Sequence, residues 1–92
     1  MRKKELLRME YKEILLMKEL HPDTEELVSV SIVGMVKASS YLIAKVTSFI
    51  EAHEWAKQQN TMIRTIDEYA QMDGNQPVVD LFESELYTKI EG

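Results

Sequence analysis

The sequence predicts an all-α protein: a bundle of three or four helices with one long central helix, completed by self-association. Only three glycines and two prolines interrupt the 92 residues, so the chain has few of the residues that form turns between strands. Apolar residues recur in steps of three and four from Val28 to Ile63, which is the spacing of a helix face. A hydrophobic content of 45% with 29% charged residues is typical of a globular chain. We therefore treat residues 1–92 as a single helical domain.

The first predicted helix covers residues 2–20, which contain no glycine or proline. Its apolar arc is wide, which indicates contact with more than one neighbour. Pro22 ends this helix because the residue before a proline avoids helical geometry. The acidic residues from Asp23 to Glu26 then suit the first turn of the next helix.

The central helix is predicted from a stripe that steps by four and three residues over about five heptads. The stripe comprises Val28, Ile32, Met35, Ser39, Leu42, Val46, Phe49, His53, Ala56, Asn60 and Ile63. A competing interpretation is a strand over residues 28–32, where β-branched residues alternate with serines. We favour the helix because a lone strand would have no partner. The polar residues 58–61 leave open whether the helix continues there or breaks.

The helical pattern then ends near Gly74, which fits the left-handed residue after a helix. Pro77 fits the first turn of a last helix over residues 77–91. A central helix of about 35–45 residues is about 50–65 Å long, and the remaining segments are too short to cover it. We therefore expect a homo-oligomer whose interface uses the central helix. Its candidate interface residues are Val28, Ile32, Met35, Val36, Leu42, Ile43, Val46, Phe49 and Ile50.

For function, we expect a non-enzymatic protein that acts by protein–protein interaction as a regulator, adaptor or inhibitor. The sequence has no phosphate-binding glycine motif, no zinc-protease motif and no cysteine, so no cofactor or metal is expected. The net charge of −5 makes a nucleic-acid partner unlikely. Lys37 and Lys45 lie inside the longest apolar stretch and argue against a membrane span. A small acidic cytoplasmic chain of this kind is compatible with an accessory protein of a bacterium or a phage.

The sequence is also compatible with two functions other than protein–protein interaction. In the first, an oligomer binds a small nucleotide, with aromatic rings stacking on the base and lysines pairing with phosphate. The candidate ligand-binding residues are Lys37, Tyr41, Lys45 and Trp55.

The second alternative is carried by two acidic pairs, Glu51-x-x-Glu54 and Asp80-x-x-Glu83. Hard cations such as Mg²⁺ prefer several carboxylate oxygens. The pattern loosely resembles the all-α nucleotide pyrophosphatases of the MazG-like family, although the second pair has aspartate first and the usual acidic run is missing. The resemblance implies Mg²⁺-dependent hydrolysis of nucleotides, with these four residues as the metal ligands.

Overall fold

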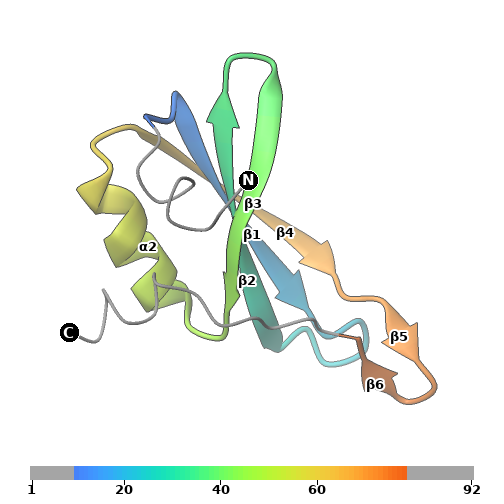
Figure 1. Cartoon of the computed structure of the whole chain (residues 1–92). Coiled ribbons are helices and arrows are strands. Elements are labelled where there is room, and N and C mark those ends of the chain that lie inside the picture. The colour runs from blue at the N-terminus through green and yellow to red at the C-terminus, as the bar shows by residue number, and fades with distance from the viewer. Residues whose placement is uncertain (1–9, 79–92) are drawn as a thin grey trace.

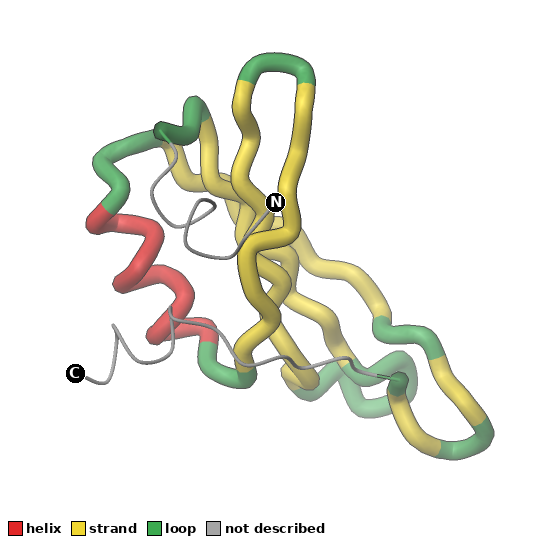
Figure 2. Tube along the Cα trace, viewed as in Figure 1, coloured by secondary structure: helices red, strands yellow, loops and turns green. Residues whose placement is uncertain are grey.

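The computed structural model describes residues 10–78, and these residues form a β-sheet with a helix packed on one face (Figure 1). The predicted all-α bundle is therefore wrong, and so is its long central helix. Strands occupy most of the segment assigned to that helix, as Figure 2 shows in yellow.

The elements follow one another in a β-β-β-α-β order and end in a small hairpin. They are β1 (Glu13–Leu20), β2 (Leu27–Val36), β3 (Ser39–Val46), α2 (Phe49–Gln58), β4 (Met62–Tyr69), β5 (Met72–Asp73) and β6 (Gln76–Pro77). The first four strands make a sheet in the order β3-β2-β1-β4. Neighbours along β1, β2 and β3 are antiparallel, whereas β4 lies parallel to β1. A parallel pair needs a crossover connection, and α2 is part of it.

The first predicted helix is also wrong where the structure describes it, because residues 13–20 form β1. Residues 2–9 lie outside the described part. The strand interpretation of residues 28–32 is the correct one, since β2 has a partner on each side. Those partner strands were not predicted because neither β1 nor β3 shows a clear alternation of apolar and polar residues.

The segment predicted as the central helix folds back on itself at Lys37 and Ala38, which form the turn between β2 and β3. Lys37 has a φ of 55°, a left-handed conformation that glycine or asparagine usually takes in a two-residue hairpin loop. The usual turn signal is therefore absent from the sequence. The pairing of β2 with β3 shifts register between Ile32 and Val33, because β3 contains a bulge at Ile43. The bulge allows the adjacent Ile43 and Ala44 both to be buried.

Helix α2 is the only described part of the long predicted helix that is helical. Ser48 caps it by accepting a hydrogen bond from the Glu51 backbone N–H. The helix ends at Gln58, and Asn60 takes a left-handed φ of 53°. The helix therefore does not continue through residues 58–61. The core lies between α2 and the sheet. Its buried residues are Tyr11, Ile14, Leu16, Val30, Ile32, Ile43, Ala44, Val46, Ala52, Trp55 and Ala56.

A glycine in β2 makes room for an aromatic ring in this core. The Tyr11 ring lies over Gly34, and a Cβ added to Gly34 would be 2.2 Å from Tyr11 Cε1. Tyr11 is buried, and this burial raises the pKa of its hydroxyl to about 12, with a smaller contribution from the electrostatic interaction with Tyr41. The ring therefore stays neutral and packed throughout the physiological pH range.

The β5–β6 hairpin projects from the end of β4 as a short arm (Figure 1). Gly74 has the left-handed conformation expected from the sequence, with a φ of 67°, but it forms the turn of this hairpin and does not end a helix. Most of the predicted last helix, residues 79–91, lies outside the described part. Within residues 10–78, no helix has both the length and the apolar character needed to cross a membrane.

Candidate interaction surface

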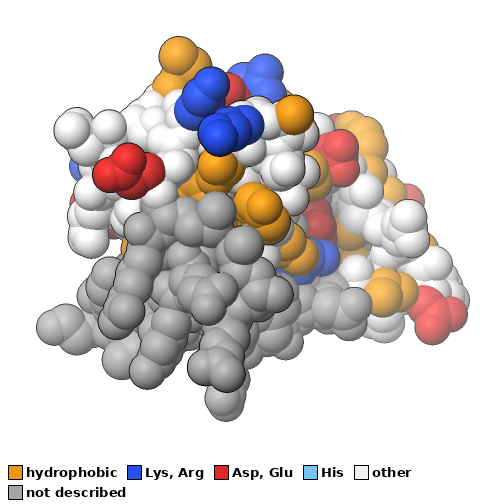
Figure 3. Space-filling view, turned by 45° about the horizontal axis from the view of Figure 1, so that its top comes forward, with side chains coloured by type: hydrophobic (Ala, Val, Ile, Leu, Met, Phe, Trp, Pro, Cys, Tyr) orange, Lys and Arg blue, Asp and Glu red, His pale blue; other side chains and the backbone are white. Residues whose placement is uncertain are grey.

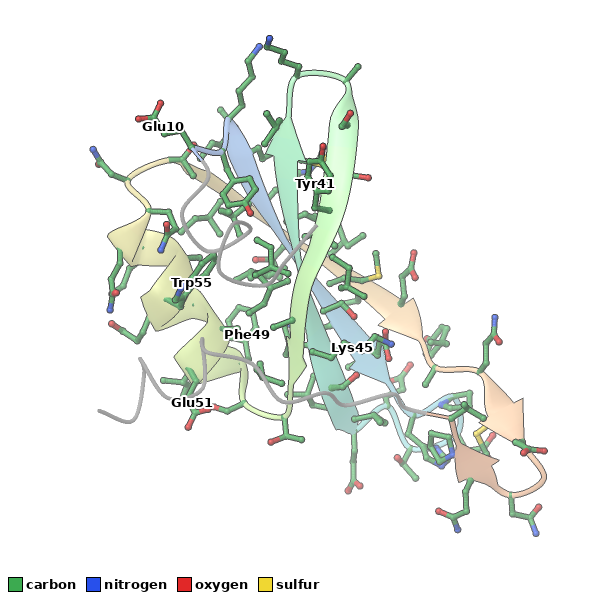
Figure 4. All side chains as sticks on the ribbon, viewed as in Figure 1. Glu10, Tyr41, Lys45, Phe49, Glu51 and Trp55 are labelled. Atoms are coloured by element: carbon green, nitrogen blue, oxygen red, sulfur yellow. The ribbon has the colours of Figure 1, made fainter. Side chains whose placement is uncertain are left out.

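The sheet has two faces, and the described helix covers only one of them. Trp55 and Phe49 lie between α2 and the sheet, whereas Lys45 lies on the side away from α2 (Figure 4). We call this second side the outer face. The strand register places seven apolar side chains on it: Leu15, Met17, Val33, Met35, Leu42, Met62 and Ile66.

These seven side chains remain partly accessible. Leu42 is 45% exposed and Met62 is 67% exposed, and the other five are half-buried. The space-filling view shows hydrophobic side chains reaching the surface at several places among charged ones (Figure 3). Within residues 10–78, α2 is the element that packs on the sheet, and it does so on the inner face, so no described helix or strand covers the outer face.

The sequence of the central strands is that of a sheet covered on both sides. In β1, residues 14–17 form an uninterrupted apolar run, Ile-Leu-Leu-Met. Strands that are buried on one face alternate apolar and polar residues, whereas strands buried on both faces carry continuous apolar runs. The β1–β4 pair is also parallel, and parallel strands usually have helices on both faces. In β1, the outer face therefore carries Leu15 and Met17 where a strand with one solvent-exposed face would carry polar side chains.

A polar cluster lies at one end of the outer face, where three strands together supply four residues. Glu19 of β1 accepts hydrogen bonds from the hydroxyls of Ser29 (2.8 Å) and Ser31 (3.1 Å) of β2. The Nζ atom of Lys45, from β3, is 3.3 Å from Glu19 Oε1, and the two side chains are only 19% and 15% exposed. We call these four residues the Glu19 cluster.

The cluster holds Glu19 in its charged form. Burial raises the pKa of this carboxyl, but the two serine hydroxyls and the Lys45 ammonium together lower it by more, so the net pKa lies below its ordinary value. Every charged group in the cluster is thereby paired, which makes the outer face suitable for burial against a partner without an uncompensated charge.

We expect Glu19→Gln to lower the free energy of unfolding by about 1–3 kcal/mol at neutral pH, because the charged acceptor of three hydrogen bonds is lost. The folded-state pKa of Glu19 is depressed. Its contribution is therefore present above the unfolded-state pKa and is lost as pH falls through the folded-state value. Urea denaturation followed by circular dichroism over an acidic pH series should show the variant and the parent converging.

Glu54→Gln is the matched control, since it breaks an exposed ion pair with Lys57 whose side chains are 52% and 56% exposed. It should change stability by less than about 0.5 kcal/mol. A Glu19→Gln difference that is as small as this control, or that does not vary with pH, would contradict the role assigned to the cluster.

The predicted interface residues do not form one stripe, because they belong to three elements. Ile32, Ile43 and Val46 are buried in the core, and Val36 and Phe49 pack against it. Val28 is half-buried in β2, and Ile50 of α2 is 74% exposed. Only Met35 and Leu42 lie on the outer face. The prediction that these nine residues share one helix is wrong, and two of them belong to the surface described above.

The four predicted ligand-binding residues are not brought together either. Lys37 lies in the β2–β3 turn, and Tyr41 pairs with Gly34 on the helix side of the sheet. Trp55 is fully buried in α2, while Lys45 is on the opposite face in the Glu19 cluster.

The acidic residues proposed as magnesium ligands are divided between described and undescribed parts of the chain. Glu51 and Glu54 lie on α2, whereas Asp80 and Glu83 lie outside the described residues. Within residues 10–78, no three acidic or histidine side chains are grouped to hold a metal ion. The all-α fold that the MazG-like resemblance implies is not the fold of this chain.

Glu19, Ser29 and Ser31 were not predicted as site residues from the sequence. The serines of Val28-Ser29-Val30-Ser31 were the available signal, because alternating small polar residues in a β-branched run mark one face of a strand. Glu19 gave no signal of its own, since its partners are 10 and 12 residues away along the chain.

No protein-family model, no curated protein and no solved structure matches this chain.

Proposed function

We propose that this chain is a non-enzymatic interaction protein, and that its outer sheet face binds an amphipathic helix of a protein partner. The observation that carries the proposal is the set of seven apolar side chains on a face that no described element covers. A surface helix of a partner presents an apolar stripe about 100° wide, which fits across neighbouring strands of a sheet.

The inner face supports this choice of partner, because α2 already packs there in the same way. Its Ala52, Trp55 and Ala56 are buried against the sheet. A second helix on the outer face would complete a three-layer arrangement, which is the ordinary environment of a parallel strand pair. We place this binding in the cytoplasm, and the absence of cysteine from the chain is compatible with that compartment.

The charges on the outer face indicate how the partner is oriented. The Glu19 cluster lies at one end of the face. Towards the other end, the Nε atom of Arg64 is 2.8 Å from Glu13 Oε1, and the Arg64 side chain is 62% exposed. Arg64 retains exposed donors for an acidic side chain at the rim of the interface, where charges affect orientation more than affinity.

The proposal is tested by site-specific photo-crosslinking in the native host. A photoreactive phenylalanine derivative replaces Leu42 on the outer face, and in a matched control it replaces Ile50, an exposed apolar residue of α2. We expect the Leu42 probe to capture a second protein at a peptide with the apolar periodicity of an amphipathic helix. We expect the Ile50 probe not to capture it.

Adding Val33→Glu to the Leu42 probe should abolish the captured product, because a charge is placed in the middle of the apolar face. The proposal is overturned if the Leu42 probe links only to residues of its own chain, if the captured peptide is not an amphipathic helix, or if Val33→Glu leaves the product unchanged.

A further inference from the structure

Strand β4 is an edge of the sheet, and its open side differs from the open side of β3. In the described part of the chain, β4 pairs only with β1, and β3 pairs only with β2. The β3 edge carries a bulge, which is one of the devices that protect an edge strand from pairing with another chain. The pairing of β4 with β1 runs through eight consecutive residues with no register shift, so β4 presents a straight edge.

The backbone groups of β4 that face this open side can be assigned from one hydrogen bond. The Ala70 N–H donates to the Leu20 carbonyl of β1 at 2.8 Å. Because successive residues of a strand point their backbone groups to opposite sides, the even-numbered residues of β4 bond to β1. The N–H and C=O groups of Ile63, Thr65, Asp67 and Tyr69 therefore point outward along the open edge.

We infer that β4 pairs antiparallel with β4 of a second copy of this chain, about a two-fold axis that passes through Ile66. This interaction involves the edge of the sheet, goes beyond the proposed function and does not depend on it. An isologous contact of this kind closes as a dimer. It joins two four-stranded sheets into one and places both outer faces on the same side.

In this register, the five central side chains of β4 meet complementary ones on the other copy. Arg64 lies opposite Glu68, and Ile66 lies opposite its own symmetry mate. On the other face of the strand, Thr65 lies opposite Asp67. Two opposite charges, two apolar residues, and a hydroxyl with a carboxylate are all favourable cross-strand pairs.

The backbone alternation supports the same register. The residues with outward-facing N–H and C=O groups lie opposite one another as hydrogen-bonded pairs, which gives about eight hydrogen bonds between the copies. Ile66 and the Arg64–Glu68 pairs then occupy the non-hydrogen-bonded positions, where opposing side chains approach most closely.

Neighbouring registers are less favourable. An axis at Thr65 places Arg64 opposite Ile66, and an axis at Asp67 places two aspartates opposite each other. Like charges directly opposite are destabilising. The eight-residue sequence of β4 therefore selects one pairing.

Cysteine crosslinking tests this register directly, because the chain contains no cysteine. In the Ile66→Cys variant, the two sulfurs lie at the two-fold axis, within the range of Cα separations that a disulfide spans. Under mild oxidation it should form a covalent dimer in high yield. Met62→Cys is the control. It lies on the same face of the same strand and is 67% exposed, but it is remote from its symmetry mate, so it should crosslink at least ten times more slowly.

Charge reversal tests the partner's identity by light scattering at tens of micromolar. The parent should have twice the 10.7 kDa mass of the chain. Arg64→Glu and Glu68→Arg should each be monomeric, since each places like charges opposite each other, and their mixture should restore the dimer. Thr65→Pro should also be monomeric, because it removes an outward N–H but no bond to β1. Circular dichroism verifies that each variant is folded.

A parent that is monomeric in this concentration range overturns the inference. Equal crosslinking of the two cysteine variants overturns it as well, as does a dimer that survives Thr65→Pro and both charge reversals. Val33→Glu on the outer face should leave the dimer intact, so failure of this inference is distinguishable from failure of the proposed function.

Discussion

Replacing Trp55 with alanine is expected to lower the free energy of unfolding by about 3–5 kcal/mol. Trp55 heads the fully buried side chains ranked by volume and has 0% of its surface exposed. It belongs to α2 and fills the space between that helix and the sheet (Figure 4). Loss of the indole removes apolar contacts on both elements and leaves a cavity. For a small domain, this loss is a large part of the total stability.

The measurement is urea denaturation followed by far-ultraviolet circular dichroism. Trp55→Phe should lose much less stability than Trp55→Ala, because a phenyl ring still fills most of the space and the buried indole N–H has no hydrogen-bond partner among residues 10–78. Ile50→Ala, at a residue that is 74% exposed, should change stability by less than about 0.5 kcal/mol. If Trp55→Ala is no more destabilising than Ile50→Ala, the packing of α2 described here is incorrect.

The second large effect is expected at Gly34, where Gly34→Ala should destabilise the protein by about 1–3 kcal/mol. Alanine is ordinarily better than glycine inside a strand. Here the added Cβ would lie 2.2 Å from Tyr11 Cε1 and 2.4 Å from Tyr11 Cδ1, so the buried ring must move. The steric conflict therefore outweighs the backbone gain.

A double-mutant cycle isolates that conflict. In a Tyr11→Ala background, the ring is absent, and Gly34→Ala should become neutral or stabilising. Gly74→Ala serves as a contrast, since no atom lies within 4 Å of its added Cβ and only its φ of +67° opposes the substitution. Its effect should be about 1 kcal/mol in either background. A Gly34→Ala effect that does not depend on Tyr11 would mean that the ring does not occupy the place over Gly34.

The error in the fold class has a specific physical origin. Steps of three and four residues are typical of a helix, but a strand with apolar residues on both faces also fills those positions. Val28, Ile32 and Met35 of β2 supplied the first part of the apparent helical stripe. The fold-back at Lys37 had no glycine or asparagine to mark it.

Some signals that depend on single residues located bends in the chain, although the elements on either side of them were predicted wrongly. Pro22 lies in the turn between β1 and β2, and Gly74 takes a left-handed conformation. The polar residues near Asn60 lie where α2 ends. Each of these depends on the backbone preference of one residue, which the sequence displays directly.

The amino-acid sequence alone indicated the bends at Pro22 and Gly74, the apolar content of the chain and the absence of the common catalytic motifs. The tertiary structure was needed to show that the chain turns at Lys37, that the bent segments are strands, that β4 returns parallel to β1, and that Glu19 meets two serines and Lys45. Backbone preferences are local, whereas the pairing of strands depends on hydrogen bonds between residues far apart in the chain. The outer face and the β4 edge exist only because of those pairings, so no reading of single segments reveals them.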